Sequence, residues 1–175
     1  GCFHNTRAIM QTSYNPTNNS LYVPFHDQCL SMTADVESKT GYGPRFGVIR
    51  PGSDPNKYMN IGKIDAATGE MKVIYSQPQG TNGSLVTTAG GLVFFGDLNR
   101  RMRALDADDG KVLWESVVGG MVMVSTITYA VNGKQYVMVF TGGAQSATSG
   151  PLELAGKSMP PAVIGHNAIY VFSLP

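Results

Sequence analysis

The sequence predicts an all-β protein, and three features of its composition and pattern support this fold class. Hydrophobic residues make up 42% of the 175 residues and charged residues only 14%, well below the roughly 25% charge of an average soluble protein. The chain also has 21 glycines and 10 prolines, which supply many turns. Between these turns lie short runs rich in Val, Ile, Tyr, Phe and Thr, and none has the length and 3.6-residue period of a helix.

One pattern occurs twice and narrows this class further. Residues 63–75 read KIDAATGEMKVIY, and residues 104–114 read ALDADDGKVLW. Asp65 and Asp106 lie 41 residues apart (106 − 65 = 41), and so do the glycines four positions after them. A repeat of roughly 40–45 residues is the period of one four-stranded β-propeller blade. Because blades form closed rings and 175 residues are too few for an ordinary ring, we expect this chain to be part of a larger propeller.

The repeated residues have structural roles in this interpretation. Asp65 and Asp106 each end a strand, where a carboxylate can accept backbone N–H groups of the following turn. Gly69 and Gly110 allow the positive φ that turns the chain into the next strand. Trp114 is expected to pack against a neighbouring blade, whereas the first copy has a valine at that position. We therefore do not take the two aspartates for catalytic carboxylates.

The regular part of the chain begins at Ile61, and turn residues divide it into short strands. Asp109-Gly110 and Asn132-Gly133 are strong hairpin signals between apolar runs. An earlier strand–turn–strand unit is expected over residues 11–24. The strands predicted after it are 61–65, 71–76, 83–87, 92–96, 102–106, 111–115, 122–129, 135–141 and 168–174.

Two stretches lack this rhythm and suggest a division of the chain. Residues 31–60 are predicted to be an insertion loop with at most one short strand at Phe46–Ile49, and residues 142–167 form a second irregular stretch. We therefore expect residues 1–60 to hold a portion of a blade plus the insertion. Residues 61–175 are expected to form two further blades, with a ring-closing strand near 168–174.

Charge and cysteine content exclude some partners and leave one question open. The formal net charge of +1 gives no electrostatic basis for binding nucleic acid. No apolar run approaches the roughly 18 residues of a membrane-spanning helix. The two cysteines, Cys2 and Cys29, match no zinc-site spacing. They are compatible with one disulfide bond in an oxidising compartment or with two free buried thiols.

The chain resembles the quinoprotein alcohol dehydrogenases along essentially its whole length. The most specific segment is residues 80–115, GTNGSLVTTAGGLVFFGDLNRRMRALDADDGKVLWE. Four further segments agree with the same family in the same order: TSYNPTNNSLYVP (12–24), GKIDAATGE (62–70), ITYAVNGKQYVMVFTGG (127–143) and NAIYVFSLP (167–175). This family has eight-bladed propellers that bind pyrroloquinoline quinone (PQQ) and a calcium or lanthanide ion, so the resemblance implies that an eight-bladed ring completes these blades.

The resemblance implies a periplasmic enzyme that oxidises an alcohol to an aldehyde or ketone and passes electrons to a cytochrome c. In the family, the quinone does the redox chemistry while the protein positions it, polarises it through the metal and supplies a carboxylate base. The metal ligands, that base and a disulfide of adjacent cysteines lie upstream of the region matched here. The resemblance therefore implies no catalytic residue and no metal ligand in this chain, which would close the ring and line the cofactor pocket.

The resemblance also indicates which residues of this chain would lie near the cofactor. The family usually has an Asn-Trp pair before the Tyr-x-Pro turn; here Asn5 takes that place earlier than expected and without the Trp. Many members have a Trp-Gly pair at the position where this chain has Thr81, Asn82 and Gly83, which we also predict to contact the cofactor. Some relatives place a substrate-facing Trp where this chain has Ala144, so a pocket for an alcohol bulkier than methanol is expected.

A second function is compatible with the repeat alone. Non-catalytic propellers of the outer-membrane assembly type share the D-x-x-x-G-x-x-x-W pattern and bind other proteins. Such scaffolds usually have short inner loops, and the long stretches at 31–60 and 142–167 therefore favour the enzyme. Recovery of PQQ from the purified protein would distinguish the two.

Overall fold

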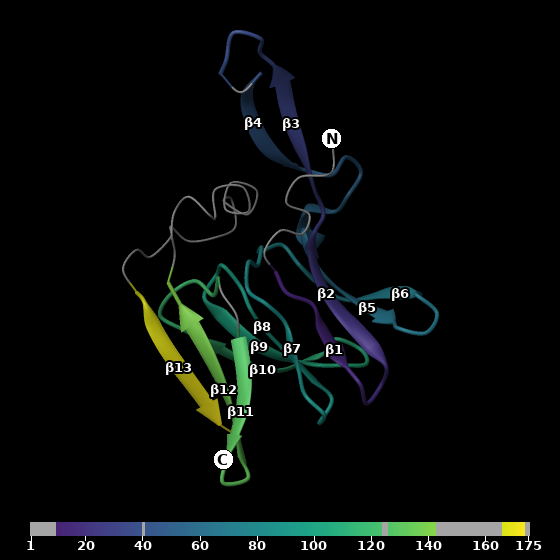
Figure 1. The fold of residues 1–175 in the computed structure, drawn as a ribbon, viewed down its shortest axis with the longest axis vertical. Coiled ribbons are helices and arrows are strands. Elements are labelled where there is room, and N and C mark those ends of the chain that lie inside the picture. Colours follow the sequence, from purple (N-terminus) through teal and green to yellow (C-terminus); the bar gives the residue numbers. More distant parts are fainter. Residues whose placement is uncertain (1–9, 40, 124–125, 143–165, 174–175) are drawn as a thin grey trace.

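The computed structural model describes residues 10–39, 41–123, 126–142 and 166–173, and its regular structure is almost entirely antiparallel β. Three sheets follow one another along the chain (Figure 1). The first has the strand order β1 (Ser13–Asn15), β2 (Ser20–His26), β5 (Met59–Asp65) and β6 (Met71–Gln77). The second runs from β7 (Val86–Thr87) through β8 (Leu92–Gly96) and β9 (Arg101–Asp106) to β10 (Val112–Val117). The third contains β11 (Thr126–Val131), β12 (Lys134–Thr141) and β13 (Ala168–Ser173).

The three sheets are stacked face to face, with a hydrophobic core in each interface. The core between the first and second sheets is formed by Tyr22, Met59, Ile61, Leu85, Val93, Phe95 and Leu105 with their neighbours. The core between the second and third sheets is formed by Met102, Val118, Val122, Val137 and Val139, with Trp114, Tyr170 and Phe172 packed against it. Because each sheet covers the apolar face of the next, the sheets stabilise one another in series.

The first strands of neighbouring sheets lie side by side. The Thr87 backbone N–H donates to Ser13 Oγ at 3.0 Å, and the hydroxyl groups of these two residues are 2.8 Å apart. Strand β11 in turn contacts β7 and β8. Four-stranded antiparallel sheets whose first strands meet in this way are the blades of a β-propeller, so the predicted all-β propeller architecture is confirmed.

The repeat forms the turns that the sequence predicts. Asp65 Oδ1 accepts the backbone N–H groups of Ala67 and Thr68 at 2.8 and 2.9 Å. Asp106 Oδ1 accepts the equivalent N–H groups in the second copy. Both glycines of the repeat have a positive φ, 75° at Gly69 and 76° at Gly110. The two aspartates are therefore turn-forming residues, as predicted.

Most predicted strands after residue 60 are confirmed within two residues at their ends, but two begin later than expected. Strand β7 covers only Val86–Thr87, whereas residues 80–85 form a buried segment without regular structure. Strand β11 begins at Thr126 rather than at residue 122, since Val122 is buried in the core before the strand begins. In both cases the sequence predicts a strand from apolar residues that instead belong to a connection packed into the core.

Most of residues 31–60 belong to an insertion, as predicted, and the strand expected at Phe46–Ile49 is part of β4, but the prediction that the insertion is mostly loop was wrong. Strands β3 (Gln28–Ala34) and β4 (Tyr42–Ile49) form a hairpin that projects away from the three sheets (Figure 1). A single 3₁₀ turn, η1 (Pro55–Lys57), follows, with Asp54 capping it. Some of the glycines and prolines that indicated a loop lie at turns, where Gly41 and Gly52 have positive φ. The others lie in β4, which among the described residues pairs only with β3.

The predicted division at residue 60 falls inside a sheet rather than between sheets. Strands β5 and β6 pair with β2 and complete the sheet begun by β1. The β3–β4 hairpin is therefore an insertion between the second and third strands of one blade. Cys29, at the base of this hairpin, is disulfide-bonded; Cys2 lies outside the described residues.

The two ends of the sheets differ in the connections that they carry. One end has the repeat turns and other short turns, at residues 16–19, 66–70, 88–91, 107–111 and 132–133. The opposite end has the hairpin insertion and the connections at 78–85 and 97–100; strands β10 and β12 end there, and β11 and β13 begin there. We call it the long-connection end. Because binding residues concentrate on connections held by a rigid scaffold, this end is where a site is expected.

Candidate functional site

The predicted site residues Thr81, Asn82 and Gly83 lie together at the long-connection end, on the connection between β6 and β7. They are part of a run, residues 80–85, in which every residue is buried although none belongs to a strand. The other two predicted site residues, Asn5 and Ala144, lie outside the described residues.

The 80–83 segment is held by hydrogen bonds to both of the sheets that it connects. The Leu98 N–H donates to the Gly80 carbonyl at 3.0 Å. The Thr81 hydroxyl donates to the Gly96 carbonyl and accepts the Gly83 N–H at 3.0 Å. Buried backbone groups outside regular structure need such partners. The Thr81 side chain is fully buried and acts within the protein as the central link of this segment.

A histidine from the first sheet completes the support of the segment. The Thr81 backbone N–H donates to His26 Nε2 at 3.1 Å, across a sequence separation of 55 residues. His26 is the last residue of β2 and is 1% exposed. Its ring stacks on Tyr58 with a centroid distance of 4.7 Å and an interplanar angle of 12°. The Tyr58 hydroxyl donates to Gln28 Oε1, and burial raises the pKa of this tyrosine.

Beside the 80–83 segment, a buried ion pair of the second sheet is hydrogen-bonded to Gln77 of the first. Arg103 Nη1 lies 2.7 Å from Asp97 Oδ2 and donates to Gln77 Oε1 at 3.0 Å. Its Nε contacts Glu115 Oε2 at 2.7 Å, and its guanidinium lies 5.6 Å from the centroid of the Phe95 ring. Burial by itself would lower the pKa of Arg103, but the hydrogen bond and the charge of Asp97 outweigh it and raise that pKa. The guanidinium is therefore a fixed positive charge.

Two glycines allow close backbone packing around this segment. A Cβ on Gly96 would lie 2.3 Å from Val122 Cγ1, and a Cβ on Gly83 would lie 3.2 Å from the Gly96 carbonyl oxygen. The connections before β7, after β8 and before β11 therefore meet at these positions. A side chain at Gly96 would separate them.

The described residues offer uncharged hydrogen-bonding groups at this end rather than a cation site. They contain no group of three or more His, Cys, Asp or Glu side chains that could hold a metal ion. Asn82 is 7% exposed, and an amide donates as well as accepts, which suits the carbonyl and carboxylate oxygens of a quinone cofactor. An amide at this position is suited to hydrogen bonding with one side of an organic cofactor.

The sequence indicated Thr81, Asn82 and Gly83 as site residues but not the residues that hold them in place. His26 could have been found from the period of two in Ser20–His26, which places it on the same buried face as Tyr22. Asp97 and Arg103 gave no such signal, because a charged residue in a strand is usually exposed. Their pairing depends on register, which places the start of β9 beside the end of β8.

Comparison with known proteins gives consistent matches. The family model described as "PQQ: Glucose/ethanol/alcohol dehydrogenase, beta-propeller domain" matches residues 57–137. The chain is 33% identical over 168 residues to quinohemoprotein alcohol dehydrogenase ADH-IIG of Pseudomonas putida, covering 87% of this chain and 23% of that protein. It is 38% identical over 94 residues to 1-butanol dehydrogenase (cytochrome c) of Thauera butanivorans, covering 46% of this chain and 14% of that protein.

Residues 57–137 thus match the PQQ dehydrogenase β-propeller domain, and the chain is a partial segment homologous to quinoprotein alcohol dehydrogenases. Among solved structures, a europium-containing methanol dehydrogenase superposes with a TM-score of 0.71 at 24% identity, covering 94% of this chain and 32% of that chain. This likeness supports the propeller fold. The chain thus spans about a quarter of the length of the quinoprotein that it matches over 168 residues. No helix in the described parts of the chain has the length and apolarity to cross a membrane.

Proposed function

We propose that this chain is part of a PQQ- and metal-dependent dehydrogenase that oxidises an alcohol to an aldehyde or ketone. The observation that carries the proposal is the match of residues 57–137 to the PQQ dehydrogenase propeller model, together with 33% identity over 168 residues to a quinohemoprotein alcohol dehydrogenase. When bound, the quinone supplies the redox chemistry by accepting two electrons from the alcohol. The calcium or lanthanide ion and its ligands, and the catalytic base, belong to parts of the enzyme outside this chain.

Within this enzyme, the 80–83 segment lines the cofactor pocket. Asn82 offers the amide, Gly83 keeps the adjacent backbone free of a side chain, and the Thr81 hydroxyl fixes the turn through its bonds to Gly83 and Gly96. We propose in addition that Asn5 contacts the cofactor. Ala144 is proposed to line the alcohol pocket and, being small, to leave room for a bulkier alcohol. The segment orients the cofactor and excludes water from one of its sides, and it takes no part in proton transfer.

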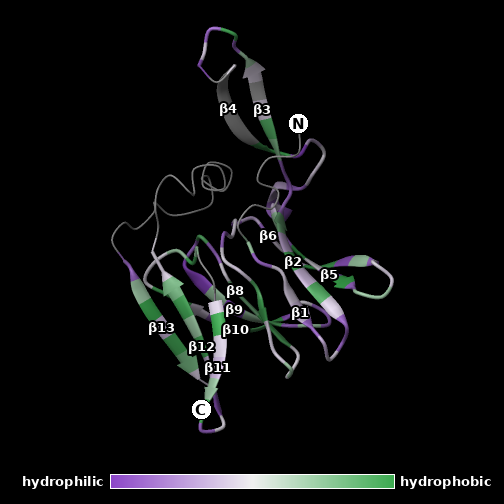
Figure 2. Ribbon diagram, in the orientation of Figure 1, coloured by the Kyte–Doolittle hydropathy of each residue, from purple (hydrophilic) through white to green (hydrophobic). Residues whose placement is uncertain are grey.

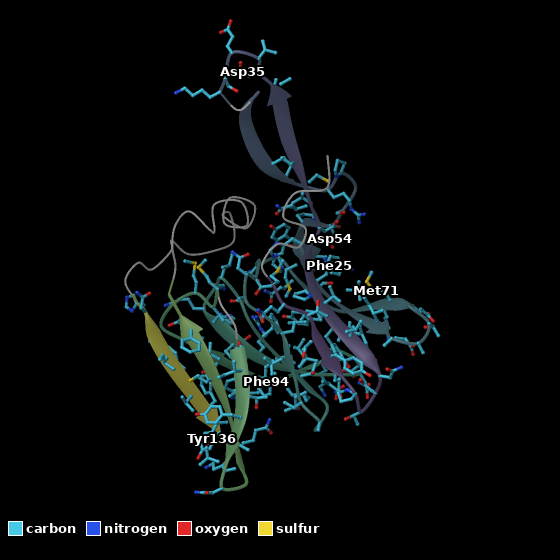
Figure 3. All side chains as sticks on the ribbon, in the orientation of Figure 1. Phe25, Asp35, Asp54, Met71, Phe94 and Tyr136 are labelled. Carbon is cyan, nitrogen blue, oxygen red and sulfur yellow. The ribbon has the colours of Figure 1, made fainter. Side chains whose placement is uncertain are left out.

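We also propose that further blades cover both outer faces of the three sheets. The first sheet turns an apolar face away from the second, formed by Tyr14, Leu21, Val23, Phe25, Ile64, Met71 and Val73. The third sheet likewise presents Ile127, Tyr129, Tyr136, Met138, Phe140, Ile169 and Val171 on the face away from the second. Figure 2 shows the hydrophobic character of β12 and β13, and Figure 3 labels Phe25, Met71 and Tyr136. Seven-residue apolar faces of this kind are normally covered.

The outer edge of the third sheet is proposed to close the ring. Within the described residues this sheet has three strands where its two neighbours have four. An apolar cavity of about 390 Å³ opens beside its last strand, between Trp114 and Leu113 of the second sheet and Phe172 of the third. A fourth strand from the rest of the ring would pair with β13 and cover this cavity. We further propose that a cytochrome c accepts the electrons and that the enzyme is periplasmic.

The test begins with the cofactor of the natively purified protein. A visible and near-ultraviolet spectrum is recorded, and the denatured extract is assayed for free PQQ. We expect PQQ in proportion to this chain. A protein that carries no quinone, and that binds none when PQQ and calcium or a lanthanide are added, would overturn the proposal and favour the scaffold.

The pocket assignment is tested by comparing two buried asparagines at opposite ends of the sheets. Asn82→Ala is expected to weaken PQQ binding in a protein that still folds. Asn15→Ala is the control, because Asn15 is buried at the short-turn end, where its amide donates to the Thr88 carbonyl at 3.2 Å. It should lower the thermal midpoint with no change in PQQ affinity. Equal PQQ affinity in Asn82→Ala and the wild type would remove this residue from the pocket.

A further inference from the structure

We infer that His26 is a positioning residue for the cofactor pocket: as a neutral hydrogen-bond acceptor, it holds the 80–83 segment in its binding conformation. The inference rests on the proposed function of that segment. His26 itself lies on a different sheet, at the end of β2, and was not among the residues predicted from the sequence.

The direction of the hydrogen bond fixes the state of the imidazole. The Thr81 backbone N–H can only donate, so His26 Nε2, at 3.1 Å, must accept with its lone pair. The ring that accepts at Nε2 is neutral, and its proton is on Nδ1. A charged imidazolium would direct an N–H group at the Thr81 N–H and lose the bond.

The surroundings of His26 keep the ring in this orientation. Tyr58 stacks on it at 4.7 Å and is itself 1% exposed, so the ring has little freedom to rotate out of the interface. Tyr58 is fixed in turn by its hydrogen bond to Gln28 and by the Asp27 N–H, which donates to its carbonyl at 2.7 Å. These contacts fix the position of His26 Nε2, the acceptor atom, where the first sheet joins the hairpin insertion.

From His26 the hydrogen bonds continue into the pocket segment without a gap. The Thr81 backbone N–H donates to His26, while its hydroxyl donates to the Gly96 carbonyl and accepts the Gly83 N–H. Asn82 lies between the two bonded residues. If the His26 bond is lost, the peptide unit before Thr81 can rotate, and the direction of the next residue changes with it. His26 thus acts on the cofactor through the backbone and does not touch it.

The matched variants are His26→Gln and His26→Asn. A glutamine side chain reaches as far as Nε2 and can accept the Thr81 N–H, whereas an asparagine reaches only as far as Nδ1. Both are polar and remove the ring, so both lose the stacking on Tyr58. The natively purified protein and both variants are stripped of PQQ and reconstituted, and PQQ affinity is measured with hydrogen exchange at the Thr81 amide.

We expect His26→Asn to bind PQQ about five- to tenfold more weakly than His26→Gln, the effect of one lost hydrogen bond. In the cofactor-free proteins, the Thr81 amide should exchange faster in His26→Asn than in His26→Gln. Equal affinities in the two variants would overturn the inference while the proposed function stands. If no form binds PQQ, the proposed function fails, and the exchange measurement still decides whether His26 holds the segment. Rapid exchange of the Thr81 amide in the wild type would also overturn it.

Discussion

The two copies of the repeat, residues 63–75 and 104–114, form the same turn in different surroundings. In both, the aspartate Oδ1 accepts two backbone N–H groups, and the glycine four residues later has a φ of 75° or 76°. The second copy lies in the middle sheet and is packed on both sides. The first copy lies in an outer sheet, and its Val73 is 43% exposed.

The comparison shows that the motif specifies the turn, while the neighbouring sheet determines how much each residue contributes to stability. A Cβ on Gly110 would lie 2.0 Å from the Ile74 carbonyl oxygen of the first sheet, whereas a Cβ on Gly69 would meet nothing within 4 Å. Trp114 of the second copy lies edge-on to Phe172 of the third sheet, with ring centroids 4.9 Å apart. Substitutions at matched positions of the two copies should therefore differ in a predictable order.

The largest difference is expected at the position before each copy, where Arg103 aligns with Gly62 (103 − 62 = 41). The Arg103 charge is tested through its partner: Asp97→Ala removes the buried carboxylate that pairs with the Arg103 guanidinium and should destabilise the protein by about 3 kcal/mol. Gly62→Ala should cost under about 1 kcal/mol, because the nearest atom to its Cβ is the flexible Met71 Sδ at 3.0 Å. Thermal and denaturant unfolding of the natively purified protein would measure both.

A double variant tests the reason for this effect. In Asp97→Ala/Arg103→Met neither charge remains buried, so most of the lost stability should return. If the double variant is as unstable as Asp97→Ala, packing rather than charge explains the loss.

The second difference concerns the two glycines of the repeat. Alanine at a φ near 75° costs about 1–2 kcal/mol at either position. Gly110→Ala adds a clash with the backbone of Ile74, which cannot be relieved by a side-chain rotation. We expect a total of about 3 kcal/mol for Gly110→Ala and only the conformational cost for Gly69→Ala. Equal losses in the two variants would show that another blade packs as closely on the first copy as the first sheet packs on the second.

The third difference compares the residues that end the two motifs. Trp114→Ala removes a half-buried ring from the interface with Phe172 and should cost about 2–3 kcal/mol, below the range for a fully buried tryptophan. Val73→Ala should cost under about 1 kcal/mol. The decisive control is turnover at a temperature where both variants are folded: we expect it to be unchanged, because Trp114 packs far from the proposed pocket, at the cavity beside β13. A folded Trp114→Ala variant with reduced turnover would contradict its structural role.

The sequence allowed the repeat to be interpreted well because its signals are local. Asp65 and Asp106 bond within their own turns, and strands β8, β9 and β10 follow directly from alternating apolar runs between turn residues. Residues 81–83 were singled out through family resemblance, and in the structure they belong to a buried run outside the strands.

The remaining features depend on contacts between residues distant in the chain. The bond from Thr81 to His26 spans 55 residues, and no pattern near either residue indicates it. The β3–β4 hairpin was missed because glycines and a proline interrupt β4, and its pairing becomes evident only from the register between Cys29 and Val48. Interfaces between sheets combine positions from separate blades, so a period within one blade does not predict them.

The smallest difference is electrostatic and joins the two copies directly. Lys63 of the first copy lies 2.7 Å from Asp108 of the second, whose side chain is 82% exposed. The hydrogen bond and the charge of Lys63 lower the pKa of Asp108, and backbone N–H groups of Thr68 and Ala67 lower the pKa of Asp65. A carboxylate with a lowered folded-state pKa stabilises the protein fully above its unfolded pKa, and this contribution is lost as the pH falls through the folded value. Both contributions should therefore disappear in acid, below the ordinary value of 3.8.

Asp108→Asn separates the two carboxylates, because it removes the ion pair and leaves the turn at Asp65 intact. At neutral pH and low salt it should cost a fraction of 1 kcal/mol, as exposed pairs do, and the cost should vanish in about 1 M salt, where the screening length is roughly 3 Å. Asp65→Asn should show no such salt dependence, since its partners are backbone N–H groups of its own turn. Thermal midpoints at low and high salt would compare the variants. A salt-independent loss in Asp108→Asn would mean that its carboxylate stabilises the second turn through the backbone, so that the two copies are joined by packing alone.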